Sequence, residues 1–244
     1  MPKFFVERGN IGEDFAFIRG EDANHIAKVL RARIGEQVVI CDGEGSDYSC
    51  EITEISAGEV KLSINEKIPC NAEPNVNITL FMALPKSDKM DYVIQKAVEL
   101  GVYKIVPFSS SRCVVKLNGG AEEKKTNRWQ KIAHAAAKQS GRGIVPEVCA
   151  PITFRELTKR AGDFDLPLLC YECEEDNSLK AVLSEKEFKN LCIVVGPEGG
   201  FDRAEVESAI SSGFKSVSLG KRILRCETAP GCAICAVLYH TDNM

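Results

Sequence analysis

Beyond residue 75 the chain alternates apolar runs typical of buried strands with amphipathic runs typical of helices, and this alternation constrains the fold more than any other feature. The first cycle is a strand over 76–83, a helix over 88–100 and a strand over 104–107. The same rhythm continues with helices over 128–140 and 202–212 and strands over 166–171, 191–195 and 216–219. Strands joined through helical crossovers run parallel. The sequence therefore predicts an α/β fold with a mainly parallel sheet.

The N-terminal part follows a different pattern. Residues 37–64 alternate short β-rich runs with turn signals, which is typical of a small β-meander or barrel. Before it we expect a short helix that is capped by Asp22 and carries Ile26, Val29 and Leu30. Residues 68–75 contain two prolines and few apolar side chains. We therefore expect a small domain over 1–72 and a larger one over 73–244.

Composition narrows the cellular setting. Hydrophobic residues make up 44% and charged residues 27% of the 244, and no apolar run approaches the ~20 residues of a membrane span. The N-terminus lacks an apolar leader with a cleavage site. We expect a soluble, cytoplasmic protein without membrane association.

The cysteines point away from disulfides. There are 11, an odd number, scattered and often inside apolar runs, so we interpret them as buried thiols. Two close pairs, Cys170 with Cys173 and Cys232 with Cys235, would form a zinc site only if they converged. Because nothing in the sequence indicates convergence, we expect no metal.

Two glycine-bearing loops follow predicted strands. The first contains Gly196, Pro197, Glu198, Gly199, Gly200 and Phe201, and the second runs over 219–229. Ligands of parallel sheets bind at the carboxyl ends of strands, and glycine permits close backbone approach to them. Each loop alone could be a tight turn with surface charges. Neither has the glycine spacing of a dinucleotide-binding loop or a P-loop, which argues against a nucleotide-binding oxidoreductase.

The two loops also carry a resemblance. Gly196 to Phe201, followed by Leu219 to Arg225 and then Glu227, Thr228 and Ala229, closely resembles the bacterial 16S rRNA uridine N3-methyltransferase family. The resemblance extends over the whole chain, through Asn24-His25, residues 29–31, 84–86, 95–101 and 129–142. Three positions depart from the usual pattern of the family: Ser111, His134 and Cys226.

The resemblance implies a SPOUT-class enzyme with a C-terminal trefoil knot, a PUA-like barrel that helps to hold RNA, and a homodimer that pairs across the knot. It implies S-adenosylmethionine as cofactor and 16S rRNA or the small ribosomal subunit as partner. The cofactor site that it implies consists of Leu84, Gly196, Pro197, Glu198, Gly199, Gly200, Leu219, Gly220, Ile223 and Leu224.

Binding to RNA requires local positive charge, because the chain carries a net charge of −4. The candidates are Arg19, Lys28, Arg31, Arg33, Arg112 and Arg142. For any single one of them a solvated surface position is the alternative, and Arg142 could instead reach a dimer interface.

Methyl transfer to N3 of uridine requires loss of the N3 proton, which spreads negative charge onto O2 and O4. We therefore expect Arg222 or Arg225 to stabilise that charge, and Glu198 to accept the proton or orient the cofactor. The alternative is that these charges only tie the loops together, which we favour for Glu227. Two other functions stay open: a methyltransferase of the same class acting on another base or on ribose, and a non-catalytic ribosome-assembly protein.

Overall fold

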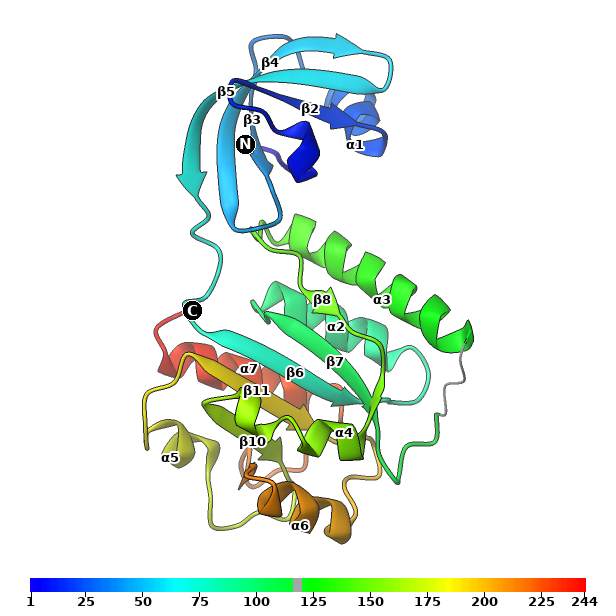
Figure 1. Cartoon of the computed structure of the whole chain (residues 1–244), viewed down its shortest axis with the longest axis vertical. Helices are drawn as coiled ribbons and strands as arrows, with labels where there is room; N and C mark the ends of the chain where they lie inside the picture. The colour runs from blue at the N-terminus through cyan, green and yellow to red at the C-terminus, as the bar shows by residue number, and fades with distance from the viewer. Residues whose placement is uncertain (116–119) are drawn as a thin grey trace. The chain divides into compact units, whose positions relative to one another are not determined.

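The structure, a computed structural model, describes residues 1–115 and 120–244 (Figure 1). Its internal contacts divide the chain into two compact units. The first consists of Met1–Glu73 with Ala137–Val145, and the second of Pro74–Ala136 with Pro146–Met244. A short segment from the middle of the chain thus belongs to the N-terminal unit.

The first unit is a five-stranded, mostly antiparallel sheet in the order β1-β3-β4-β5-β2. Only β1 and β3 pair in parallel. The strands are β1 (Lys3–Phe5), β2 (Phe15–Arg19), β3 (Gln37–Cys41), β4 (Ser46–Ser56) and β5 (Glu59–Pro69). Ile40, Ile52 and Leu62 are fully buried at its centre. The β-meander that the sequence predicts is therefore confirmed.

The helix of the first unit differs from the sequence-based expectation. It begins after Gly20 as α1 (Glu21–Asn24) and continues as a π-helix over His25–Leu30. Asp22 does not cap it, because this residue lies inside the first turn, where its carboxylate binds the ammonium of Lys138. Ile26 is buried, whereas Val29 is 67% exposed. The expected capping by Asp22 is therefore wrong.

The second unit contains a sheet in the order β12-β10-β11-β6-β7-β8, with β9 also paired to β7. All of these pairs are parallel, which confirms the predicted mainly parallel sheet. The strands are β6 (Asn77–Ala83), β7 (Lys104–Ser109), β8 (Glu147–Val148), β9 (Ile152–Thr153), β10 (Leu166–Cys170), β11 (Asn190–Val195) and β12 (Lys215–Val217).

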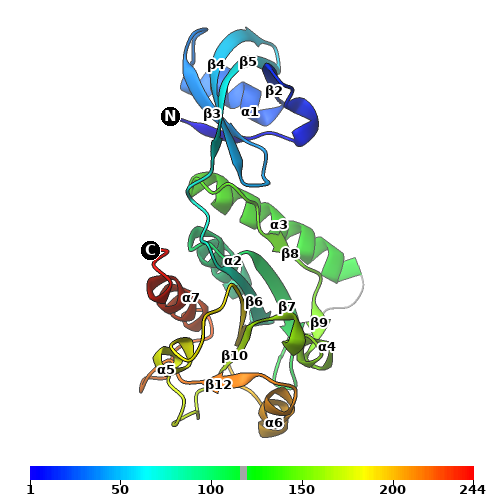
Figure 2. The same cartoon turned by 60° about the vertical axis from the view of Figure 1, so that its left-hand side comes forward.

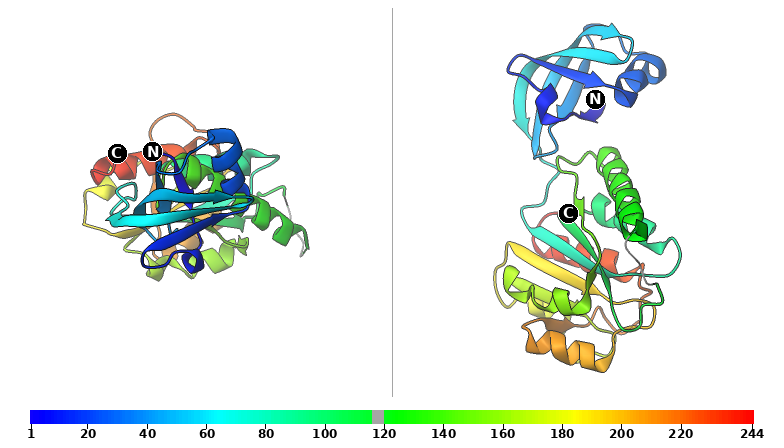
Figure 3. Two further views of the ribbon diagram at one scale, coloured as in Figure 1. Left: turned by 90° about the horizontal axis from the view of Figure 1, so that it is seen from above. Right: turned by 45° about the vertical axis from the view of Figure 1, so that its right-hand side comes forward.

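Helices cover both faces of this sheet (Figure 2). The first group, α2 (Lys89–Glu99), α5 (Leu179–Leu183) and α7 (Ala229–His240), lies on one face, where α7 contacts β6 and β11. The second group, α4 (Phe154–Thr158) and α6 (Arg203–Ser211), lies on the other. Figure 3 shows α7, in red, behind the strands in its right-hand view. Helix α3 spans Gly120–Gln139.

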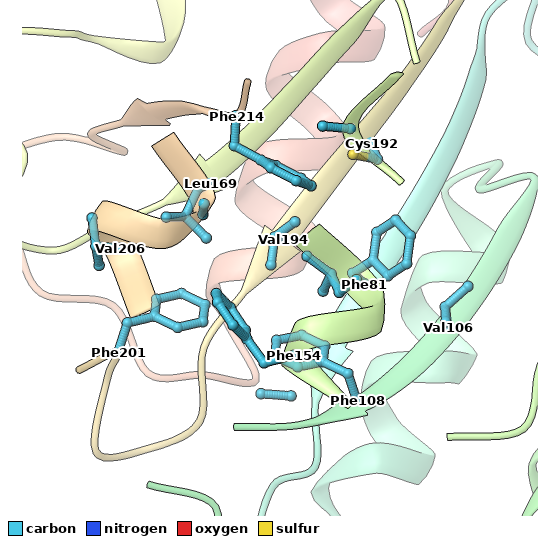
Figure 4. Close-up of a cluster of buried hydrophobic side chains, with 14 residues drawn as sticks. Phe81, Val106, Phe108, Phe154, Leu169, Cys192, Val194, Phe201, Val206 and Phe214 are labelled. Atoms are coloured by element: carbon cyan, nitrogen blue, oxygen red, sulfur yellow. The ribbon is translucent and has the colours of Figure 1, made fainter. Parts of the chain in front are cut away.

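A cluster of aromatic and aliphatic side chains fills the space between the sheet and helices α4 and α6 (Figure 4). Phe81 and Phe108 come from the sheet, and Phe154 from α4. Helix α6 begins with the capping box that the sequence predicts, in which the side chains of Asp202 and Glu205 accept backbone N–H groups of the first turn. This core packs against residues near the carboxyl ends of β6, β10 and β11.

Candidate active site

A cavity of about 550 Å³ lies at the carboxyl edge of the parallel sheet. Most of its wall consists of residues 195–200, at the end of β11 and in the loop that follows, and residues 218–227 after β12. The structure therefore brings the two glycine-bearing loops together. Residues 170–172 after β10 and Lys89 of α2 complete it. Its size is within the range of about 300–1,000 Å³ that is usual for small-molecule sites.

The first loop is anchored to the core by Phe201. Phe201 is 3% exposed, and its ring stacks with that of Phe108 at a centroid distance of 6.4 Å. It packs at a tilt against the ring of Phe154, at a centroid distance of 5.9 Å (Figure 4). A Cβ on Gly196 would lie 3.0 Å from this ring. A side chain at this position would therefore require the loop or the ring to shift by a few tenths of an ångström.

The loops use glycine for its conformational freedom as well. Gly200 has a φ of +65° and Gly220 a φ of +114°, in a region that side chains disfavour. The backbone of both loops can consequently line the cavity directly.

A charged cluster lies on one side of the cavity. The ammonium of Lys89 is 3.0 Å from Glu198 Oε1 and 3.2 Å from Glu227 Oε2. The backbone N–H of Lys86 donates to Glu198 Oε1 at 3.1 Å, and the thiol of Cys226 donates to Glu227 Oε2 at 3.2 Å. Lys89 thus links three segments: the turn after β6, the first glycine loop and the segment before α7.

These contacts set the protonation of the cluster. Partial burial alone would raise the pKa of Glu198, but hydrogen bonds from Lys89 and from backbone N–H groups outweigh it and hold that pKa below its usual value. The pKa of Glu227 is also lowered, by its own backbone N–H and then by Cys226 and Lys89. The two carboxylates raise the pKa of Lys89. The cluster is therefore ionised at neutral pH.

Cys226 behaves differently. Burial, and then its hydrogen bond to Glu227, raise its pKa to about 12. It is consequently a neutral thiol that orients Glu227.

The segment after β7 braces the first glycine loop from outside. Arg112 Nη1 donates to the carbonyl of Gly199 at 2.9 Å, and Nη2 lies 3.5 Å from Asp202. Ser111 donates to Glu205 from its backbone N–H at 2.7 Å and from its hydroxyl at 2.9 Å. Arg112, an RNA candidate in the sequence, is thus also a support for the loop.

Most of the expected cofactor residues line the cavity. They are Gly196, Pro197, Glu198, Gly199, Gly200, Leu219, Gly220, Ile223 and Leu224. Arg222 and Arg225 line it as well. Leu84 is 3% exposed just after β6 and lies outside the lining.

Lys89, Tyr171 and Glu172 also line the cavity, although the sequence did not predict them there. Lys89 could have been predicted from its position, because it follows β6, a strand that ends at the same sheet edge as the strands before the glycine loops. The position of residues 170–172 at the end of β10 gave the same signal.

The remaining RNA candidates lie in the first unit. Lys28, Arg31 and Arg33 are exposed. The side chain of Arg19 is 58% exposed and pairs with Glu59 at 2.6 Å. Arg142 is 2% exposed and its guanidinium binds Glu73, so this residue does not belong to the accessible basic surface that the sequence predicts.

Among the described residues, no group of three His, Cys, Asp or Glu side chains could hold a metal ion. Within the same ranges, no helix has both the length and the apolar character that crossing a membrane requires.

Comparison with known proteins decides the family. A family model described as RNA methyltransferase domain matches residues 72–238, and one described as RNA methyltransferase PUA domain matches residues 18–65. A protein of Bacillus subtilis (strain 168) named Ribosomal RNA small subunit methyltransferase E is 38% identical over 250 residues, which cover 99% of this chain and 98% of the relative. This chain belongs to the ribosomal RNA small subunit methyltransferase E family. Its N-terminal PUA domain and its methyltransferase domain are therefore those of the family.

Further relatives and solved structures agree with this family. The protein of that name from Mesomycoplasma hyopneumoniae (strain 232) is 37% identical, with 94% of this chain and 95% of the relative covered. A crystal structure of the Neisseria gonorrhoeae protein of that name, bound to S-adenosyl methionine, superposes with a TM-score of 0.86 at 33% identity, covering 98% of this chain and 97% of that one. A Legionella pneumophila structure in complex with the same cofactor has a TM-score of 0.84 at 27% identity, with 97% and 96% covered.

Proposed function

We propose that this protein transfers a methyl group from S-adenosylmethionine to N3 of a specific uridine in 16S ribosomal RNA. The observation that carries the proposal is the cavity of about 550 Å³ between the two glycine-bearing loops, in a chain of the methyltransferase E family. The solved relative that binds S-adenosyl methionine supports the same cofactor.

The residues of the cavity fit this cofactor. Leu219 and Leu224 offer apolar surface to an adenine ring, and the glycine backbone of residues 196–200 and Gly220 offers peptide groups to its edge. The ionised carboxylates of Glu198 and Glu227 suit a ligand that carries positive charge. When bound, the cofactor supplies a methyl group on a sulfonium, which is electrophilic without any metal.

Arg222 and Arg225 are the proposed stabilisers of the uracil anion. Both line the cavity, and the side chain of Arg225 is 84% exposed, so it is accessible to a base that enters from solvent. A guanidinium near O2 or O4 favours loss of the N3 proton because it stabilises the charge that develops there.

Glu198 is proposed as a group that orients the cofactor. Its pKa is held low by hydrogen bonds from Lys89 and from backbone N–H groups, and a carboxylate of low pKa is a weak proton acceptor. Of the two roles open to this residue from the sequence, orientation therefore fits its surroundings better. In this proposal solvent takes the N3 proton.

The proposed architecture has a PUA-like domain over 1–72 that helps to hold RNA and a SPOUT domain over 73–244 that ends in a trefoil knot. Two subunits pair across the knot, in the cytoplasm. The outward side of α7 supports the pairing, because Cys232 and Tyr239 are exposed there and residues 229–239 carry no charged side chain. The target uridine must be unpaired or extruded, since N3 lies on the pairing face.

Two measurements test the function. Titration calorimetry with S-adenosylmethionine should give saturable binding, and its absence would favour a non-catalytic ribosome-assembly protein. Mass spectrometry of 16S rRNA from cells with and without the protein should then show one 3-methyluridine that depends on it. A methylated ribose or a different methylated base in that comparison would assign the chain to another reaction of the same class.

A further inference from the structure

Lys89 makes contacts that a surface lysine does not usually make. It is the first residue of α2, and its ammonium lies within 3.2 Å of carboxylates from two other segments, Glu198 and Glu227. The three side chains are 33%, 28% and 20% exposed. All three line the cavity, so this partly shielded ion cluster forms part of the ligand site.

We propose that Lys89 is a positioning residue for methyl transfer, which keeps Glu198 and Glu227 ionised side by side and aligned on the bound methyl donor. This inference rests on the proposed function. Lys89 itself has no role there as acid, base or contact to the uracil, and it acts through the two carboxylates.

The backbone around Lys89 holds it in place. Ser87 has a φ of +56°, which is unusual for a residue with a side chain and marks a tight turn between β6 and α2. That turn aims the N–H of Lys86 at Glu198, and the buried Met90 and Val93 fix the start of α2 on the core. The backbone that carries the ammonium is therefore held at the start of a helix that packs on the core.

The charges around the cluster make the lysine necessary. Two carboxylates within reach of one ammonium would repel each other without it, and one of them would then keep its proton to a higher pH. Cys226 lies 3.9 Å from the ammonium but is a neutral thiol, and Arg225 reaches Glu227 only at 4.0 Å. Asp88, the residue before α2, is 85% exposed and lies 3.8 Å from Arg128. The other charged groups of the cavity wall are Glu172, Lys221 and Arg222.

The test compares Lys89→Met with two other variants. Lys89→Arg keeps the positive charge, and Lys96→Met is the matched control, because Lys96 pairs with Glu99 at 2.7 Å on the same helix but outside the cavity wall. Calorimetry measures S-adenosylmethionine affinity from about pH 5 to pH 9, and kcat is measured over the same range on small ribosomal subunits.

Both affinity and kcat should fall at the acid end of the pH range, which is the acid limb of each profile. For Lys89→Met we expect this limb to move to higher pH by roughly one unit or more. Lys89→Arg should restore most of the wild-type profile, and Lys96→Met should match the wild type throughout. A double variant, Lys89→Met with Glu227→Gln, should bring the limb back down, because it removes one of the two repelling charges. A purely structural lysine would lower stability without this pH shift and without the rescue.

An acid limb that stays in place in Lys89→Met, or fails to return in the double variant, overturns the inference. If Lys89→Met does not fold, Lys89→Gln replaces it, with the same expected shift and the same contradicting result. Wild-type protein that binds no S-adenosylmethionine would instead overturn the proposed function, so the two failures are distinguishable.

Discussion

The guanidinium of Arg142 donates to both carboxylate oxygens of Glu73, from Nε at 3.2 Å and from Nη2 at 2.5 Å. The same carboxylate accepts the backbone N–H groups of Gly143 at 2.8 Å and Ile144 at 3.1 Å. The Arg142 side chain is only 3% exposed. This bidentate pair therefore fastens residues 142–144 to the end of the N-terminal segment, within one unit.

Replacing Arg142 by alanine should destabilise the first unit by about 1.5–3 kcal/mol, because the Glu73 carboxylate, whose side chain is 16% exposed, would lose two charge-assisted hydrogen bonds and keep only the N–H groups of Gly143 and Ile144. Urea unfolding followed by circular dichroism measures the loss. Arg203→Ala is the control, since Arg203 and Glu207 form an exposed pair with side chains 89% and 64% accessible, and it should cost no more than about 0.5 kcal/mol. Equal losses for the two variants would contradict a special role for the Arg142 pair.

Substituting alanine at Gly196 tests how the first loop is supported. The new Cβ would lie 3.0 Å from Phe201, a ring held by Phe108 and Phe154, so the loop rather than the ring must shift. We expect the displaced loop to weaken the free energy of S-adenosylmethionine binding by about 1–3 kcal/mol. This corresponds to an affinity lower by roughly ten- to a hundredfold. Gly162→Ala is the control, because a Cβ there meets nothing within 4 Å. Wild-type affinity in Gly196→Ala would show that the loop tolerates the displacement.

The parallel sheet and its ligand edge were predictable from the sequence because both depend on local signals. Apolar runs marked β6 and β11, the Asp202 and Glu205 pair marked the start of α6, and glycines marked the loops. Strand ends in a parallel sheet share an edge, so both loops were expected at that edge, whereas their meeting there depends on the strand order β12-β10-β11.

The ion pairs were not predictable, since they join residues that are distant in the chain. Lys89, Glu198 and Glu227 are brought together only by the order of the strands, and no periodicity marks them. Arg142 looks like any surface arginine in the sequence, and its burial depends on where Glu73 lies. The exposure of each charged side chain therefore depends on the tertiary structure around it and not on the residue type.

The pH dependence of stability can be tested at Asp42, in the turn between β3 and β4. Burial alone would raise the pKa of Asp42, but hydrogen bonds from the N–H groups of Glu44 and Ser46, from Tyr48, and the charge of Arg8 lower it overall. A lowered folded-state pKa stabilises the protein above the unfolded pKa of about 3.9, and this contribution disappears as the pH falls through the folded value.

Asp42→Asn keeps an acceptor for the turn and removes only the charge. We expect it to lose about 1–2 kcal/mol at pH 6–7, with the difference from wild type shrinking below about pH 4. Chemical unfolding at a series of pH values measures this. Glu13→Gln, at an exposed carboxylate of the same unit, is the control and should cost no more than about 0.5 kcal/mol at pH 6–7. A loss in Asp42→Asn that is the same at every pH would contradict the charge-based explanation.

Exposed basic residues of the first unit should control RNA binding. Replacing Lys28, Arg31 or Arg33 by alanine should each weaken binding to small-subunit RNA and lower the slope of log affinity against log salt by about one. Filter binding over a range of salt concentrations gives the slope, and calorimetry should show unchanged cofactor affinity. Lys180→Ala, at an exposed lysine of the second unit, is the control. An unchanged slope in all three variants would place the RNA elsewhere.

The reactivity of Cys226 follows from its surroundings. The residue is 7% exposed, and its thiol donates to Glu227 at 3.2 Å and has a pKa raised to about 12, so very little thiolate is present near neutral pH. At about pH 8, iodoacetamide should therefore modify Cys226 more slowly than the exposed Cys173 by roughly a hundredfold or more. Peptide mass spectrometry over time measures both rates, and the difference should vanish in denaturant, where the environment of Cys226 is lost. Rapid alkylation of Cys226 in the native protein would mean that its side chain leaves Glu227, and the carboxylate that faces Lys89 would then lack this support.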